Sequence, residues 1–196
     1  MQALILGLVL FLGIHSVRIF ADDWRTARRA AMGEMAWKGL YSVVSVVGLV
    51  LIVWGYGQAR QTPVLLWETP LWTRHLAALL TLLSFVLLAA AYVPRNALKL
   101  RLQHPMVLSV KVWALAHLLA NNTLADVLLF GGFLVWAVLC FRAARRREPV
   151  STAAAPSAAA TSLTVAVGVA AWAVFAMWGH AALIGVRPLM AAAATS

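Results

Sequence analysis

The sequence predicts an all-α, polytopic integral membrane protein with about six transmembrane helices in a bundle. Three observations lead to this prediction: 63% of the 196 residues are hydrophobic, only 11% are charged, and long apolar stretches recur along the chain. A soluble domain has about 45–50% apolar and about 25% charged residues. The net charge of +10 is also typical of nucleic-acid-binding proteins. Apolar runs long enough to cross a bilayer exclude that class, so no nucleic-acid partner is expected.

Six segments have the length and polarity of membrane spans, since about 20 residues cross the hydrocarbon core. They are 3–20, 39–57, 72–93, 105–119, 124–141 and 163–186. The first is expected to be a retained helix and not a signal peptide, because no Lys or Arg precedes Arg18. The fourth is short and carries Lys111, which predicts a tilted helix or a tight hairpin with the fifth. Pro94 and Pro105 mark helix boundaries, because proline lacks the N–H group and clashes with the preceding turn.

The basic residues predict the orientation of these spans. Twelve of the sixteen Lys and Arg residues fall in the first, third and fifth connections, three (Arg60, Arg74 and Arg187) fall on the opposite side, and Lys111 lies within a span. The positive-inside rule therefore places connections one, three and five in the cytoplasm of a bacterial inner membrane, with both termini periplasmic. Residues 145–162 are predicted to be a flexible cytoplasmic connector within a single domain that covers 1–196. The lone cysteine, Cys140, excludes an intramolecular disulfide and a cysteine-based metal site.

Histidines and one lysine are the candidate functional groups inside the membrane, because all six acidic residues fall outside the spans or at their edges. An ionisable group within a span raises the free energy of membrane insertion, so such groups are functional candidates by default. His15 and Arg18 share one helix face by their spacing. The imidazole suits a metal ion, and the cation suits an anionic tail such as a haem propionate. The alternative is a histidine hydrogen-bonded between helices beside an arginine that reaches the interface.

The fourth span carries a second candidate site around His117. Ala114, one turn earlier, leaves room for a flat group, and Asn121, one turn later, would fix the ring tautomer or cap the helix. Lys111 lies about 120° further round the helix, and its alternative role is to reach the interface or bond a carbonyl. No helix has two histidines at metal-binding spacing, so a metal site would be assembled between helices. Other histidines near span ends are alternative ligands or interfacial hydrogen-bonding groups: His75, His104 and His180.

Four stretches of this sequence resemble the NnrU family of membrane proteins, in the same order and over most of the chain. They are LILGLVLFLGIHSVRI near the start, AAYVPRNALKLRLQHPMVLSVKVWALAHLLANN at 90–122, LLFGGFLVWAV at 128–138, and the closing GHAALIGVRPL. The part from His104-Pro105 to His117 is the most specific, and Asn122 stands where family members usually have glycine. The resemblance implies a link to nitrite and nitric-oxide metabolism in denitrifying bacteria.

The family is similar in turn to the zeta-carotene isomerase, a haem b membrane enzyme that isomerises a cis double bond of a polyene. The shared motifs are His15-Ser16 and the block that ends at His117. The resemblance therefore implies haem b, with His15 and His117 as axial iron ligands and Arg18 at a propionate. The isomerase has a cysteine where this chain has Ala114, so a thiolate–imidazole ligand switch cannot occur here. By depth along the helices alone, His117 would pair more readily with one of two other histidines, His75 or His180.

Three functional hypotheses follow from these residues. The first is an inner-membrane haem b protein of the NnrU type that serves redox chemistry, polyene isomerisation or nitric-oxide sensing, with nitric oxide or a hydrophobic small molecule as its ligand. The second is a non-catalytic accessory or transport protein with a polar cavity around Lys111, His117 and Asn121. The third is an enzyme similar to membrane lipid methyltransferases, in which a His-Pro motif also precedes a helical hairpin.

Overall fold

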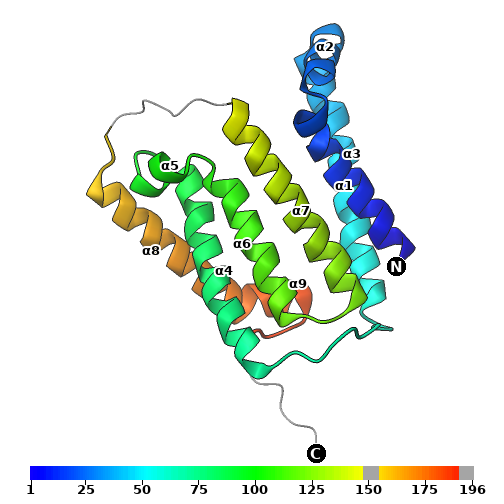
Figure 1. The fold of residues 1–196 in the computed structure, drawn as a ribbon, viewed down its shortest axis with the longest axis vertical. Helices are drawn as coiled ribbons and strands as arrows, with labels where there is room; N and C mark the ends of the chain where they lie inside the picture. Colours follow the sequence, from blue (N-terminus) through cyan, green and yellow to red (C-terminus); the bar gives the residue numbers. More distant parts are fainter. Residues whose placement is uncertain (148–154, 190–196) are drawn as a thin grey trace, which may run out of the picture. The chain divides into compact units, whose positions relative to one another are not determined.

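The computed structural model describes residues 1–147 and 155–189. These residues form helices, and the only β-type pairing among them is an isolated bridge between Leu65 and Thr123. The predicted all-α class is therefore confirmed (Figure 1). The helices are α1 Gln2–Phe20, α2 Asp22–Met32, α3 Glu34–Ala59, α4 Leu71–Tyr92, α5 Ala97–Leu102, α6 Pro105–Ala120, α7 Leu124–Arg147, α8 Ala158–Val174, the π-helix η1 Phe175–Gly179, and α9 His180–Ile184.

Each of the six expected spans is helical. Five helical stretches are long and apolar enough to cross a membrane, namely α1, α3, α4, α7 and the continuous run Ala158–Ile184. The sixth, α6, is apolar but has 16 residues. At 1.5 Å per residue it is about 24 Å long, shorter than the hydrocarbon core of about 30 Å. The expectation of about six spans, with a short fourth one, agrees with this arrangement.

Both ends of the expected connector 145–162 are helical in the structure. Helix α7 continues to Arg147, and α8 begins at Ala158, five residues before the expected start of the last span. The early start has a local cause, because the Ser157 side chain accepts a hydrogen bond from the Ala160 N–H at 3.4 Å and caps the helix. Residues 148–154 of the connector lie outside the described part of the chain.

Two connections contain short helices that the search for spans did not predict. Helix α2 has Asp22 and Asp23 in its first turn and Arg29 in its last, charges that suit the helix dipole. Helix α5 begins after Asn96, whose side chain accepts a hydrogen bond from the Lys99 N–H at 2.7 Å. Both helices are too short to span a membrane, so they leave the number of spans unchanged.

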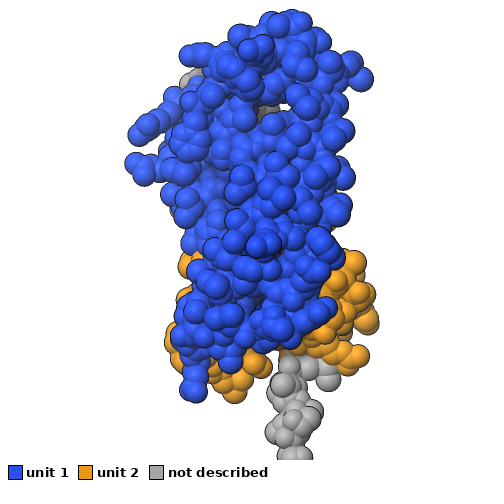
Figure 2. Space-filling model, turned by 90° about the vertical axis from the view of Figure 1, so that its right-hand side faces the viewer, with its two compact units in different colours: residues 1–68, 121–147 blue, residues 69–120, 148–196 orange. Residues whose placement is uncertain are grey.

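The described chain divides into two compact units, coloured separately in Figure 2. Unit 1 comprises residues 1–68 and 121–147, and unit 2 comprises the other described residues, 69–120 and 155–189. In unit 1, α1 and α3 run antiparallel in close contact at glycines. A Cβ atom on Gly7 would lie 2.6 Å from the backbone nitrogen of Ile52, and one on Gly48 would lie 2.8 Å from that of Phe11. Small residues permit this approach of two membrane helices, as is common at such interfaces.

The first turn of α7 is bonded to the C-terminal end of α3, which is the end of this pair opposite α2. The Tyr56 hydroxyl donates a hydrogen bond to Oδ1 of Asp126 at 2.6 Å, and the Thr123 hydroxyl donates to Oδ2, also at 2.6 Å. Asp126 was placed at the edge of a span by its sequence position, and the structure buries it to 5% exposure. Two backbone hydrogen bonds of 2.9 Å between segments 64–66 and 122–124 close the same end of the unit.

In unit 2, α4 packs against α6 and α8. The Ser84 hydroxyl donates to the Ser109 carbonyl at 2.9 Å, and the Trp172 indole N–H donates to the Thr81 hydroxyl at 3.1 Å. An apolar groove of about 530 Å³ lies between α4, α8 and η1. Its lining residues are Phe85, Val167, Ala170, Ala171, Val174, Phe175 and Gly179.

Candidate functional site

The first candidate ligand, His15, lies on α1 within a cluster of aromatic rings in unit 1. Its ring stacks on Phe11 with the ring centroids 4.2 Å apart. Tyr41 of α3 and Trp136 of α7 approach it edge-on, with centroid distances of 5.1 and 6.2 Å. Nδ1 of His15 lies 2.7 Å from the carbonyl oxygen of Phe11, one turn earlier on the same helix.

The second candidate, His117, has the same local arrangement on α6 in unit 2. Its Nδ1 lies 2.8 Å from the carbonyl oxygen of Trp113, again one turn earlier. The Trp113 ring lies 5.0 Å from the imidazole, as the Phe11 ring lies close to His15. Each histidine therefore has an aromatic ring and a backbone acceptor at the i−4 position.

This hydrogen bond determines the tautomer of a neutral imidazole. A carbonyl oxygen only accepts hydrogen bonds, so Nδ1 carries the hydrogen and Nε2 keeps a lone pair. Histidines that bind metals almost always donate their other N–H to a carboxylate, a backbone carbonyl or water. The chemistry of His15 and His117 therefore suits an iron ligand through Nε2, and the neighbouring rings suit a flat, apolar group. The sequence analysis gave Asn121 two alternative roles, fixing the ring tautomer of His117 or capping the helix; in the structure the Trp113 carbonyl lies at hydrogen-bonding distance from Nδ1.

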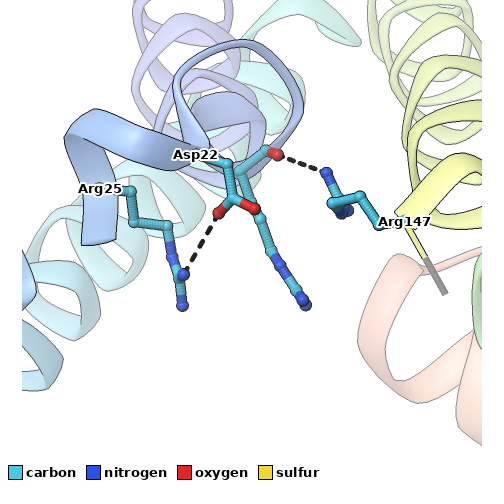
Figure 3. A network of polar contacts seen from close by, with 4 residues as sticks. Asp22, Arg25 and Arg147 are labelled. Carbon is cyan, nitrogen blue, oxygen red and sulfur yellow. Dashed lines mark hydrogen bonds and ion pairs between the residues drawn. The ribbon is translucent and has the colours of Figure 1, made fainter. Parts of the chain in front are cut away.

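The other predicted site residues are distributed over the two units. Arg18 is exposed in the last turn of α1, and its carbonyl oxygen accepts a hydrogen bond from Arg147 of α7 at 2.6 Å (Figure 3). Lys111 is half-buried on α6 in unit 2, and Asn121 is half-buried in the turn before α7, in unit 1. Ala114 has no exposed surface, so its methyl group is covered by other atoms of the chain. The expected open space beside it is not present.

The three alternative histidines all lie in unit 2, in different environments. His75 is exposed in the second turn of α4. His104 directly precedes α6, and its carbonyl accepts a hydrogen bond from the Leu108 N–H at 3.2 Å. His180 follows the π-helix, and its Nδ1 lies 2.8 Å from the Val186 carbonyl. In the described ranges, no group of three or more His, Cys, Asp or Glu residues is arranged to hold a metal ion.

The sequence analysis missed the ring cluster around His15 and the buried carboxylate of Asp126. The cluster has no local signal, because its rings come from three helices far apart in the sequence. The sequence does contain a signal for the Asp126 carboxylate, because the spacing of Thr123 and Asp126 is that of a capping box. The Asp126 N–H donates to the Thr123 hydroxyl at 3.2 Å while Oδ2 accepts from the Thr123 N–H at 3.0 Å.

The helical fold, with five stretches in its described residues long and apolar enough to cross a bilayer, defines an integral membrane protein. Ionisable groups within its apolar helices include His15, Lys111 and the buried Asp126. Residues 3–188 match the family described as NnrU protein, and the chain belongs to that family. The match extends over nearly the whole sequence, which confirms the resemblance read from its motifs. No curated protein and no solved structure matches the chain.

Proposed function

We propose that this protein binds haem b in the membrane, with His15 and His117 as the residues that would hold the iron. The observation that carries the proposal is the shared geometry of these two histidines. In each, Nδ1 donates to the carbonyl one turn earlier, at 2.7 and 2.8 Å, which directs the lone pair of Nε2 away from the helix's own backbone. Two imidazoles with this tautomer are suitable ligands for haem iron.

The residues near His15 are chemically suited to bind a flat, apolar ligand with an anionic edge. Phe11, Tyr41 and Trp136 surround the imidazole with rings that would contact a porphyrin face or edge. Arg18, one turn further along α1, supplies the positive charge that would neutralise a propionate. Apolar helices around the site and imidazole ligands are the two factors by which this chain would set the redox potential of the iron.

When bound, the haem would supply one-electron chemistry and a site where ligand exchange can occur. The family resemblance favours a role in nitrite and nitric-oxide metabolism, with nitric oxide or a hydrophobic small molecule as ligand. Polyene isomerisation through a cysteine ligand is disfavoured, because Ala114 stands at the corresponding position. For one-electron chemistry and for ligand exchange alike, the residues of this chain would hold the iron and exclude water from it.

A visible spectrum of the full chain tests the proposal. The protein is expressed with ample haem, purified in detergent, and measured oxidised and reduced. We expect a Soret band and sharp α and β bands on reduction, lost or shifted in His15→Ala and in His117→Ala. His75→Ala should keep these bands, because His75 is exposed in the second turn of α4; their loss in this variant would instead assign the ligand to His75. A colourless wild type would refute haem binding and favour an accessory or transport protein.

We also propose an orientation for the spans in a bacterial inner membrane, with the first, third and fifth connections cytoplasmic. The support is the distribution of charge, twelve basic residues against three. A reporter that is active only in the periplasm, fused after Ser196, is expected to be active. An inactive C-terminal reporter, together with an active one inserted in the first connection, would show the opposite orientation.

A further inference from the structure

Helix α2 is held directly at the end of two membrane spans. Only Ala21 separates it from α1, and only Gly33, with φ +82°, separates it from α3. Figure 1 shows α2 at the end of the α1 and α3 pair, running across it. Because both of its ends are attached to spans within one residue, α2 lies at the level where those spans leave the hydrocarbon core. None of its residues is buried within the protein.

One side of α2 is apolar and continues into exposed hydrophobic residues at both of its ends. Trp24, Ala27 and Ala31 follow the i, i+3, i+7 spacing of one helix face. Large apolar side chains around it are strongly exposed: Phe20 at 72%, Trp24 at 50%, Met32 at 44% and Met35 at 80%. Such a helix, amphipathic and polar on average, is typical of those that lie in a membrane surface.

The polar side of α2 is basic, and its acidic neighbours neutralise only part of it. Arg25 pairs with Asp22 at 3.4 Å (Figure 3), while Arg29 and Lys38 share one carboxylate, Glu34, at 3.3 and 2.8 Å. Arg28 lies over the Trp24 ring at 5.7 Å, and none of the described carboxylates forms an ion pair with it. The Arg28 guanidinium is therefore available to phosphate oxygens, and Arg29, whose single carboxylate partner is shared with Lys38, keeps part of its charge for them.

We propose that α2 is an interfacial helix that binds the headgroups of anionic phospholipids through Arg28 and Arg29. Its apolar face enters the boundary between headgroups and acyl chains, and Trp24 lies at the depth that indole rings prefer. The arginines then reach the phosphates of the leaflet next to α2. This surface is independent of the haem proposal, because none of its residues touches His15 or His117 in the described contacts.

Probe depth tests the placement of the helix. In the full chain with Cys140→Ser, Ala31→Cys and Thr26→Cys place a fluorescent label about 140° apart round α2. Both positions are exposed in the protein. In vesicles, we expect a quencher attached to lipid chains to act on the label at 31, and iodide in water to act on the label at 26. Equal quenching by iodide at both positions would overturn the proposal and favour a helix that docks another protein.

Lipid binding tests the role of the arginines. Phosphatidylglycerol and phosphatidylcholine with identical chains are titrated into the full chain in detergent. Each arginine near an anionic surface contributes about fivefold in affinity, so Arg28→Gln with Arg29→Gln should weaken phosphatidylglycerol binding about 25-fold. The matched control is Arg60→Gln with Arg74→Gln, which removes two exposed arginines elsewhere. Equal loss in the control, equal binding of both lipids, or full competition by glycerol phosphate would each refute the proposed lipid site.

Discussion

The hydrogen bond between Tyr56 and Asp126 gives the most direct test of how unit 1 is held together. Tyr56→Phe removes the hydroxyl that donates to Oδ1 at 2.6 Å and leaves the ring in place. The carboxylate keeps its two hydrogen bonds from Thr123, so a single bond is lost. A hydrogen bond to a charged group contributes about 1.5–3 kcal/mol. The free energy of unfolding should fall by about that amount, because Asp126 is only 5% exposed and water cannot readily replace the hydroxyl.

The assay is equilibrium unfolding of the full chain in mixed micelles, followed by circular dichroism. Tyr92→Phe is the matched control, because Tyr92 is 69% exposed and its hydroxyl has no hydrogen bond among the described residues. The control should change stability by less than about 0.5 kcal/mol, as surface substitutions usually do.

A double-mutant cycle then isolates the interaction between the two side chains. Asp126→Ala also removes the cap on Thr123, but that loss is common to both arms of the cycle and cancels. We expect a coupling energy of about 1.5–3 kcal/mol between positions 56 and 126. A coupling energy close to zero, or equal effects of Tyr56→Phe and Tyr92→Phe, would refute the assignment of this bond as the link between α3 and α7.

Three further predictions concern packing and can be measured in the same unfolding assay. Gly7→Ala should destabilise the protein by about 1–3 kcal/mol, because its Cβ would lie 2.6 Å from a backbone nitrogen of α3; Gly13→Ala, with nothing within 4 Å, should be neutral or slightly stabilising. Asn96→Ala should cost about 1–3 kcal/mol, because the 1% exposed amide caps α5 and donates to the Ala90 carbonyl at 3.0 Å. Trp172→Phe should cost about 1 kcal/mol through loss of the indole hydrogen bond, and full retention of stability would argue against that contact.

The helices could be predicted from sequence because each depends on a local property. Runs of apolar residues, with Pro105 at a boundary, predicted the six segments that the structure shows as helices. The short helix α2 was not predicted although its signals are local, because a helix of 11 residues that is polar on average lacks the long apolar run that marks a span. Its acidic first turn and basic last turn are visible in the sequence.

The candidate ligands were also chosen by local reasoning, since His15 and His117 are ionisable groups within apolar sequence. Their hydrogen bonds are local too, each to the residue four positions earlier, but no periodicity predicts that a ring nitrogen will find a carbonyl there. That outcome depends on the rotamer, which the neighbouring side chains select.

By itself, the sequence determined that this chain is a helical membrane protein, which segments form its apolar helices, and which charged and imidazole groups are candidate functional groups. Those properties follow from hydrophobicity and charge, which each residue carries wherever it lies. Only the tertiary structure decided that Tyr41 and Trp136 meet His15, and that Asp126 at a span edge is buried beneath Tyr56. These contacts join residues 26 to 121 positions apart, and they exist because glycines let α1 and α3 approach closely and hydrogen bonds fix α7 to the same unit.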